Sequence, residues 1–185
     1  MSKKFDVTIC GIFVADIIGR PIDLKQNITI GSLTMIDDIK LFTGGLNCNM
    51  AIDLAKMGFK AAVMGRLSND NWKALFTSEF DKYGVDYSSV VLDDKFPSAA
   101  TIVCVDPGGE RTFFHSGGNS VGLCADDILS KIDTIKNSKY FALGYYGCMP
   151  ALEPVLPDVL NEIRKQTDTK LLLETAGFVR STLDD

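Results

Sequence analysis

Four positions in the amino-terminal third of the chain have residue types that suit a polyhydroxy ligand. Asp16 follows a buried apolar run, and Gly44-Gly45 leads into a helical pattern that carries Asn49 in its first turn. A carboxylate accepts hydrogen bonds from neighbouring hydroxyls, an asparagine both donates and accepts, and glycines let a ligand approach the backbone closely. We therefore expect Asp16, Gly44, Gly45 and Asn49 to converge on one polyol, beside the free N–H groups of the helix start.

Each of these residues also has an ordinary structural interpretation. Asp16 could cap a turn at a strand end, the glycine pair could make a tight strand-to-helix turn, and Asn49 could be an unremarkable first-turn residue. The presence of all of them in one region of the chain favours the ligand interpretation.

Other polar residues are assigned no chemistry. Asp70 is interpreted as part of a helix N-cap region. His115 is interpreted as a half-buried strand residue that would touch a ligand only if its strand closed over the site. Glu153 and Glu174 are interpreted as a helix-face residue and a strand-end residue.

Two nucleotide-binding motifs are absent from the sequence. A P-loop requires Gly-Lys followed by Ser or Thr, and no Gly-Lys dipeptide occurs. The dinucleotide fingerprint would follow the first strand, where the chain instead reads Gly-Ile-Phe-Val-Ala-Asp from Gly11. A Walker-type NTPase is excluded, and a nicotinamide-dependent oxidoreductase loses its main support.

The elements that must position these residues alternate between strand and helix. Buried strands are predicted at 5–14, 61–66, 140–144 and 170–174, and helices at 47–57, 71–84, 126–136 and 151–166. This alternation predicts an α/β fold with a doubly wound, mostly parallel sheet. Ligands of such sheets bind at the carboxyl ends of strands, where Asp16 is expected.

Two stretches, near 18–43 and 96–118, interrupt the alternation. The first contains strand-like pieces without helical periodicity, and the second contains a hairpin signal around Pro-Gly-Gly-Glu. We expect them to form a small antiparallel β-lid inserted into a single domain that covers 1–185, because no hydrophilic linker separates them from the rest.

The amino-acid composition excludes several classes of binding partner. The chain has 185 residues, 46% of them hydrophobic, and 19 Lys+Arg against 24 Asp+Glu. No basic field is available for nucleic acid or a membrane surface, and a single histidine argues against a His-rich metal centre. Five cysteines without a C-x-x-C pair, and no apolar segment long enough to span a bilayer, predict a cytoplasmic protein.

In these residues the sequence resembles the PfkB, or ribokinase-like, family of carbohydrate and nucleoside kinases. The resemblance is carried by Gly11 to Asp16, by Gly44-Gly45 with Asn49 and Ala51, by Gly58, and by Met64 to Asp70. It implies a doubly wound core with a β-lid, ATP with Mg²⁺ as phosphoryl donor, and a sugar or nucleoside hydroxyl as acceptor. It also implies that Asp16, Gly44, Gly45 and Asn49 bind the acceptor. Separately, we expect a homodimer in which lid strands pair across a two-fold interface.

The sequence departs from the family pattern at several points. Leu46 stands where ribokinases often have lysine, Asn47 and Ser68 replace usual small residues, and 111–117 lacks the second arginine expected for a sugar acid. A neutral sugar or a nucleoside is therefore the expected acceptor. The family's Gly-Ala-Gly-Asp motif, which holds the catalytic base, does not occur.

We therefore expect the chain to be the amino-terminal part of a longer kinase. On this expectation it contains no catalytic residue, its ATP-binding residues stay unassigned, and it transfers no phosphate alone. A second hypothesis is a non-catalytic small-molecule binding or dimerisation module of the same fold. A downstream Gly-Ala-Gly-Asp favours the kinase, and a natural stop codon after Asp185 favours the module.

Overall fold

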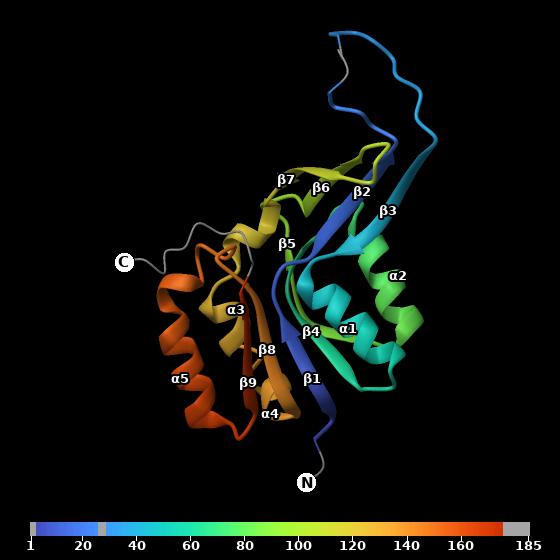
Figure 1. Cartoon of the computed structure of the whole chain (residues 1–185). Coiled ribbons are helices and arrows are strands. Elements are labelled where there is room, and N and C mark those ends of the chain that lie inside the picture. The colour runs from blue at the N-terminus through green and yellow to red at the C-terminus, as the bar shows by residue number, and fades with distance from the viewer. Residues whose placement is uncertain (1–2, 26–28, 176–185) are drawn as a thin grey trace.

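The computed structural model describes residues 3–25 and 29–175, which form two sheets with helices around the larger one (Figure 1). The larger sheet has the strand order β5-β4-β1-β8-β9, and the smaller sheet has the order β3-β2-β6-β7. The strands are β1 (Phe5–Cys10), β2 (Val14–Arg20), β3 (Asp38–Gly44), β4 (Ala61–Ser68), β5 (Asp86–Asp93), β6 (Ala99–Val105), β7 (Arg111–Ser116), β8 (Ser138–Tyr146) and β9 (Lys170–Thr175). The helices are α1 (Leu46–Lys56), α2 (Lys73–Tyr83), α3 (Ala125–Leu129), α4 (Ile132–Lys136) and α5 (Leu156–Gln166), with short 3₁₀ turns η1 (Gly118–Gly122) and η2 (Glu153–Val155).

The larger sheet is parallel at each of its four pairings, which confirms the predicted fold class. Helices α1 and α2 cover one face, and α3, α4 and α5 cover the other (Figure 1). In β1, Val7 and Ile9 pack toward α1 and α2, whereas Cys10 belongs to the core on the opposite face. A strand buried on both faces has no reason to alternate, which explains the uninterrupted apolar runs.

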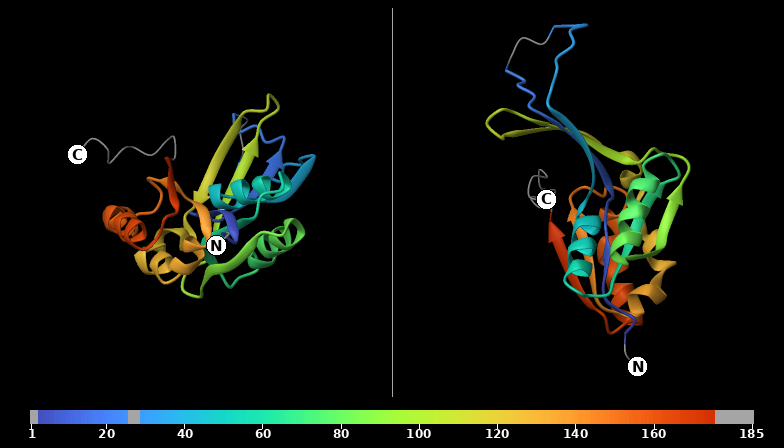
Figure 2. Two further views of the ribbon diagram at one scale, coloured as in Figure 1. Left: turned by 90° about the horizontal axis from the view of Figure 1, so that it is seen from below. Right: turned by 90° about the vertical axis from the view of Figure 1, so that its right-hand side faces the viewer.

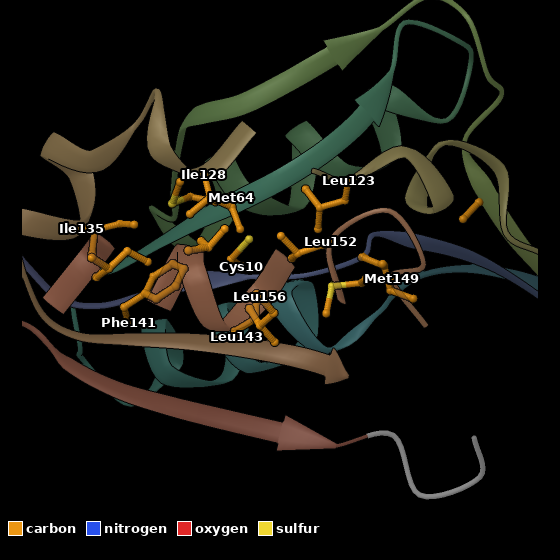
Figure 3. Packing of buried hydrophobic residues seen from close by; sticks show 14 of the residues in the cluster. Cys10, Met64, Leu123, Ile128, Ile135, Phe141, Leu143, Met149, Leu152 and Leu156 are labelled. Atoms are coloured by element: carbon orange, nitrogen blue, oxygen red, sulfur yellow. The ribbon is translucent and has the colours of Figure 1, made fainter. Parts of the chain in front are cut away.

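The core on the α5 side fixes the carboxyl half of the sheet. Phe141 and Leu143 of β8 pack there with Met64 of β4, as Figure 3 shows. Helix α5 contributes Leu156, Val159 and Ile163, which are buried and spaced as one helical stripe. This packing holds the end of β8 against the centre of the sheet.

The smaller sheet, called the lid sheet from here on, stands across the upper end of the larger one (Figure 2). Its outer pairings, β2 with β3 and β6 with β7, are antiparallel as expected. Its central pairing, β2 with β6, is parallel, so the sheet is mixed rather than purely antiparallel. Its first strand begins at Val14, four residues before the expected lid segment near 18–43.

The predicted single strand at 5–14 is wrong. The chain leaves the larger sheet after Cys10 and enters the lid sheet at Val14. The break falls at Gly11, where a Cβ would crowd the Gly144 carbonyl of β8 and where Asn47 Nδ2 donates to the Gly11 carbonyl at 3.1 Å. Asp16 therefore lies inside β2 of the lid sheet rather than at the end of β1.

Three smaller expectations also differ from the structure. Strand β5 has a polar, edge-strand sequence and was not predicted. The expected helix at 126–136 is two short helices, α3 and α4. In the stretch near 18–43, where strand-like pieces are expected, residues 29–33 form no strand, and 26–28 lie outside the described residues.

Candidate functional site

A pocket of about 380 Å³ lies between the lid sheet, the start of α1 and the end of β8. Asp16 of β2, Gly45 at the start of α1 and Asn49 in the first turn of α1 all line it. The sequence placed these three residues in one site, and the structure brings them together. Gly44 does not line the pocket but lies directly behind Asp16.

Asp16 occupies the middle of a cross-strand row on the pocket face of the lid sheet. It stands opposite Phe42 of β3 and Thr101 of β6, and Thr101 stands opposite His115 of β7. Burial raises the pKa of the Asp16 carboxyl, and the neighbouring Thr101 hydroxyl and the charge of His115 partly offset that rise. The carboxylate is thus half-buried and lines the pocket.

Gly44 and Gly45 are each required to be glycine, for different structural reasons. A Cβ on Gly44 would overlap the Asp16 carboxylate, so the glycine makes room for that side chain. Gly45 has φ +87° and caps α1, and a Cβ there would strike the Ile12 carbonyl. One glycine therefore places the carboxylate, and the other permits the turn that aims the start of α1 at the pocket.

Asparagines at 47 and 49 have opposite surroundings. Asn49 is exposed at the pocket, and its backbone N–H donates to the Gly45 carbonyl at 3.0 Å. Asn47 is fully buried; its Nδ2 donates to the carbonyls of Gly11 (3.1 Å) and Met64 (3.2 Å), and its Oδ1 accepts from the Cys48 N–H (2.9 Å). The Asn47 side chain therefore links the end of β1, strand β4 and α1 by hydrogen bonds, a role that sequence analysis missed.

The pocket also contains residues that sequence analysis did not assign. Thr101, Arg111 and Tyr145 line it, and Tyr145 has φ 66°, a strained value for a residue with a Cβ. Tyr145 lies one residue beyond the strand predicted at 140–144, so the rule that ligands bind at strand ends could have found it. Thr101 and Arg111 lie in the predicted hairpin, but only the observed register shows that they share a face with Asp16.

The described residues offer little support for nucleophilic or metal chemistry at this pocket. Cys148 lines it, but burial, followed by the charges of Glu153 and Glu174, raises the pKa of the Cys148 thiol. A protonated thiol is a poor nucleophile. Within 3–25 and 29–175, no group of three or more His, Cys, Asp or Glu side chains is arranged to hold a metal ion.

The residues interpreted as structural have structural contacts. Asp70 accepts hydrogen bonds from the N–H of Trp72 (3.0 Å), next to the start of α2, and from the N–H of Ser98 (2.8 Å). Glu153 Oε1 accepts from the Met149 N–H at 2.7 Å, and Glu174, at the end of β9, accepts from the Tyr145 N–H at 3.0 Å. These contacts fix loops around the site.

His115 differs from its expectation. It is exposed rather than half-buried, and it lines the pocket without any further closure of the lid. The reason is that β7 is the edge strand of the lid sheet, so that one side of the strand has no neighbour among the described residues.

The sequence profile of the family described as pfkB family carbohydrate kinase matches residues 6–183. The chain belongs to this family. Among its pfkB relatives, a probable fructokinase-5 from Arabidopsis thaliana is 28% identical over 142 residues, which are 76% of this chain and 43% of the relative. A 5-dehydro-2-deoxygluconokinase from Clostridium perfringens is 25% identical over 166 residues, 88% of this chain and 46% of the relative.

Solved structures agree on the fold. The ribokinase of Arabidopsis thaliana, complexed with ribose and ATP, superimposes with a TM-score of 0.75 at 17% identity, over 96% of this chain and 55% of that one. The chain spans about half the length of the curated relatives that it matches. No described helix has both the length and the apolar character needed to cross a bilayer.

Proposed function

We propose that this chain supplies the acceptor-binding half of a kinase that transfers the γ-phosphoryl group of ATP to a hydroxyl of a neutral sugar or a nucleoside. The observation that carries the proposal is the convergence of Asp16, Gly45 and Asn49, from two elements, on one pocket beneath the lid sheet. Membership of the pfkB family supports phosphoryl transfer as the reaction.

The pocket has the chemistry of a polyol site. Asp16 offers a carboxylate that accepts from two adjacent hydroxyls, while the exposed amide of Asn49 can donate back to the same ligand. Gly45 lets the ligand approach the backbone at the start of α1. Apolar residues such as Val14, Val103 and Phe113 complete the walls of the pocket.

Phosphoryl transfer needs more than this acceptor-binding pocket. A base must take the proton of the acceptor hydroxyl, and cationic groups or amides must hold the transferred phosphoryl group in line. Among the described lining residues, Arg111 is the one lysine or arginine, which is too little for a triphosphate. We assign the base, the anion-binding amides and the sites of ATP and Mg²⁺ to protein corresponding to the part of the relatives that this chain does not span.

The acceptor site is tested by calorimetric titration of the chain with fructose, ribose, adenosine and a sugar acid. We expect binding of at least one neutral acceptor, a loss of about 2–4 kcal/mol in Asp16→Ala, and no loss in the matched surface variant Asp94→Ala. Absence of binding by every acceptor, or equal loss in both variants, would contradict the proposed site.

An ATP-consumption assay with the same acceptors tests whether the catalytic base and the ATP site lie outside this chain. The 185-residue chain is expected to show no turnover, and robust turnover would refute the proposal that base and ATP site lie elsewhere. Binding without turnover in the longest natural form of the protein would instead support a non-catalytic binding module of the same fold.

Two further properties belong to the proposal. We place the protein in the cytoplasm, which its five unpaired cysteines support because thiols persist in a reducing compartment. We also propose a homodimer formed through the lid sheet, supported by the exposed apolar side chains on the lid face that points away from the pocket.

A further inference from the structure

Asp16, Thr101 and His115 stand in register on three neighbouring strands of the lid sheet. Side chains directly opposite one another on paired strands point to the same face, and all three line the pocket. Thr101 is only 7% exposed, and its Oγ1 lies 3.0 Å from His115 Nδ1. The threonine hydroxyl is thus the central link of a polar row that runs from the half-buried Asp16 carboxylate to the edge of the lid sheet.

The number of protons available in this row determines the direction of its hydrogen bonds. A threonine hydroxyl has one proton, and an ionised carboxylate can only accept. Thr101 stands directly opposite Asp16, and its hydroxyl lowers the pKa of the Asp16 carboxyl, which is the effect of a hydroxyl whose proton points toward the carboxylate. Thr101 Oγ1 must then accept from His115, so the imidazole carries a proton on Nδ1.

The neutral imidazole that satisfies this requirement has its lone pair on Nε2. Because Nδ1 is engaged with Thr101 and the ring lines the pocket, Nε2 is the nitrogen left for a ligand. The pocket then presents two groups that accept hydrogen bonds, the Asp16 carboxylate on the inner strand β2 and His115 Nε2 on the edge strand β7. Both are complementary to the hydroxyls or amino groups of a ligand.

We propose that His115 is a further acceptor-binding residue, whose Nε2 accepts a hydrogen bond from a hydroxyl or amino group of the acceptor. Thr101 is the positioning residue that holds both the imidazole and Asp16. The identity of the ligand as a phosphoryl acceptor rests on the proposed function, whereas the protonation of Nδ1 does not. A sugar or nucleoside that has no hydroxyl or amino group facing the lid sheet should bind about tenfold more weakly than its hydroxylated counterpart.

The protonation of the imidazole can be measured directly, because His115 is the single histidine of the chain. Two-bond ¹H–¹⁵N correlation spectra at pH 8, above the ordinary titration range of imidazole, report the neutral tautomer. We expect the Nδ1–H form to dominate in the wild type and to give way to the Nε2–H form in Thr101→Val, while Thr101→Ser keeps the wild-type pattern. A wild-type spectrum dominated by Nε2–H, or one that Thr101→Val leaves unchanged, overturns the proposal.

A matched control comes from the opposite face of the lid. Thr112 of β7 is exposed and stands opposite Cys104, so its side chain is not part of the row. Thr112→Val should leave the imidazole spectrum unchanged. An equal change in both valine variants would show a general disturbance of the lid and overturn the assigned link.

Ligand contact is tested with two variants of His115 titrated with fructose, ribose and adenosine. Asparagine can place an amide near the Nδ1 position but has nothing at Nε2, whereas glutamine can bring its side-chain oxygen toward Nε2. We expect His115→Asn to weaken binding about tenfold and His115→Gln to recover part of it. Binding that is lost in Asp16→Ala but unaffected in both His115 variants would refute the contact and leave the proposed function intact. Failure of every acceptor to bind the wild type would overturn the proposed function and the contact together, with the tautomer measurement still valid.

Discussion

At the scale of single residues, Asp16 shows the conflict between ligand binding and stability. Burial raises the pKa of its carboxyl, so the folded protein holds the ionised form less readily than the unfolded chain does. Ionised Asp16 therefore destabilises the fold at any pH above its raised pKa. As pH falls through the raised pKa toward the ordinary carboxyl range, this penalty disappears.

Asp16→Asn is accordingly expected to increase the free energy of unfolding at pH 8 while it weakens acceptor binding. The gain should shrink as the pH falls through the raised pKa and be absent below the ordinary carboxyl range, because Asp16 is then protonated in both the folded and the unfolded state. Urea unfolding across this pH range, with Asp94→Asn as control, measures the difference. A gain that is constant with pH would show that desolvation of the carboxylate is not its cause.

Gly44 provides a second prediction at this scale. Its backbone is not in the left-handed region, so alanine is tolerated by the chain itself, but the added Cβ would overlap the Asp16 carboxylate. Gly44→Ala should thus displace Asp16 and weaken acceptor binding about tenfold or more, with a smaller effect on stability. Gly45→Ala is the contrast, because its φ of +87° adds backbone strain of about 1–3 kcal/mol. Calorimetric titration and urea unfolding of both variants separate the two effects, and equal loss of stability would contradict the distinction.

At the scale of elements, Asn47 joins the end of β1, strand β4 and the start of α1. Removal of its side chain leaves the carbonyls of Gly11 and Met64 and the Cys48 N–H without this partner in a buried region. We expect Asn47→Ala to lower the free energy of unfolding by about 2–4 kcal/mol. Asn161→Ala, on the exposed surface of α5, should change it by less than about 0.5 kcal/mol. A loss in Asn47→Ala as small as that of the control would show that these hydrogen bonds do not stabilise the fold.

The same elements show how far sequence reasoning extends. Helix α1 and the hairpin of β6 and β7 were predicted within a few residues, because a helical stripe and a Pro-Gly-Gly turn are local signals. The sequence does not show where the chain passes from β1 to β2, because residues 9–15 are apolar and buried without a polar break. The membership of Asp16, Gly45 and Asn49 in one pocket was predicted from residue types and family resemblance. Thr101 and His115 were not, because their place beside Asp16 depends on strand register, which is a long-range property.

At the scale of the whole molecule, the lid sheet has two faces with different tasks. One carries the Asp16, Thr101 and His115 row over the pocket. On the opposite face, a second row in register contains Leu41, Ile102 and Phe114, which are 52%, 49% and 56% exposed. A contiguous apolar face on a thin sheet is costly in water and marks an interaction surface. Lid pairing in a homodimer would cover this face and support the acceptor site from behind.

The proposed dimer can be tested by placing a charge on this second row. Ile102→Lys and Phe114→Lys should each weaken association at least about tenfold, because the two-fold axis of a homodimer brings like charges together on a desolvated surface. Met57→Lys is the matched control, since Met57 is 71% exposed at the end of α1, outside the lid sheet. Sedimentation velocity over a range of concentrations should show a dimer for the wild type and Met57→Lys and a shift toward monomer for the lid variants. A wild type that remains monomeric, or lid variants that associate as tightly as the control, would contradict a homodimer formed through this face.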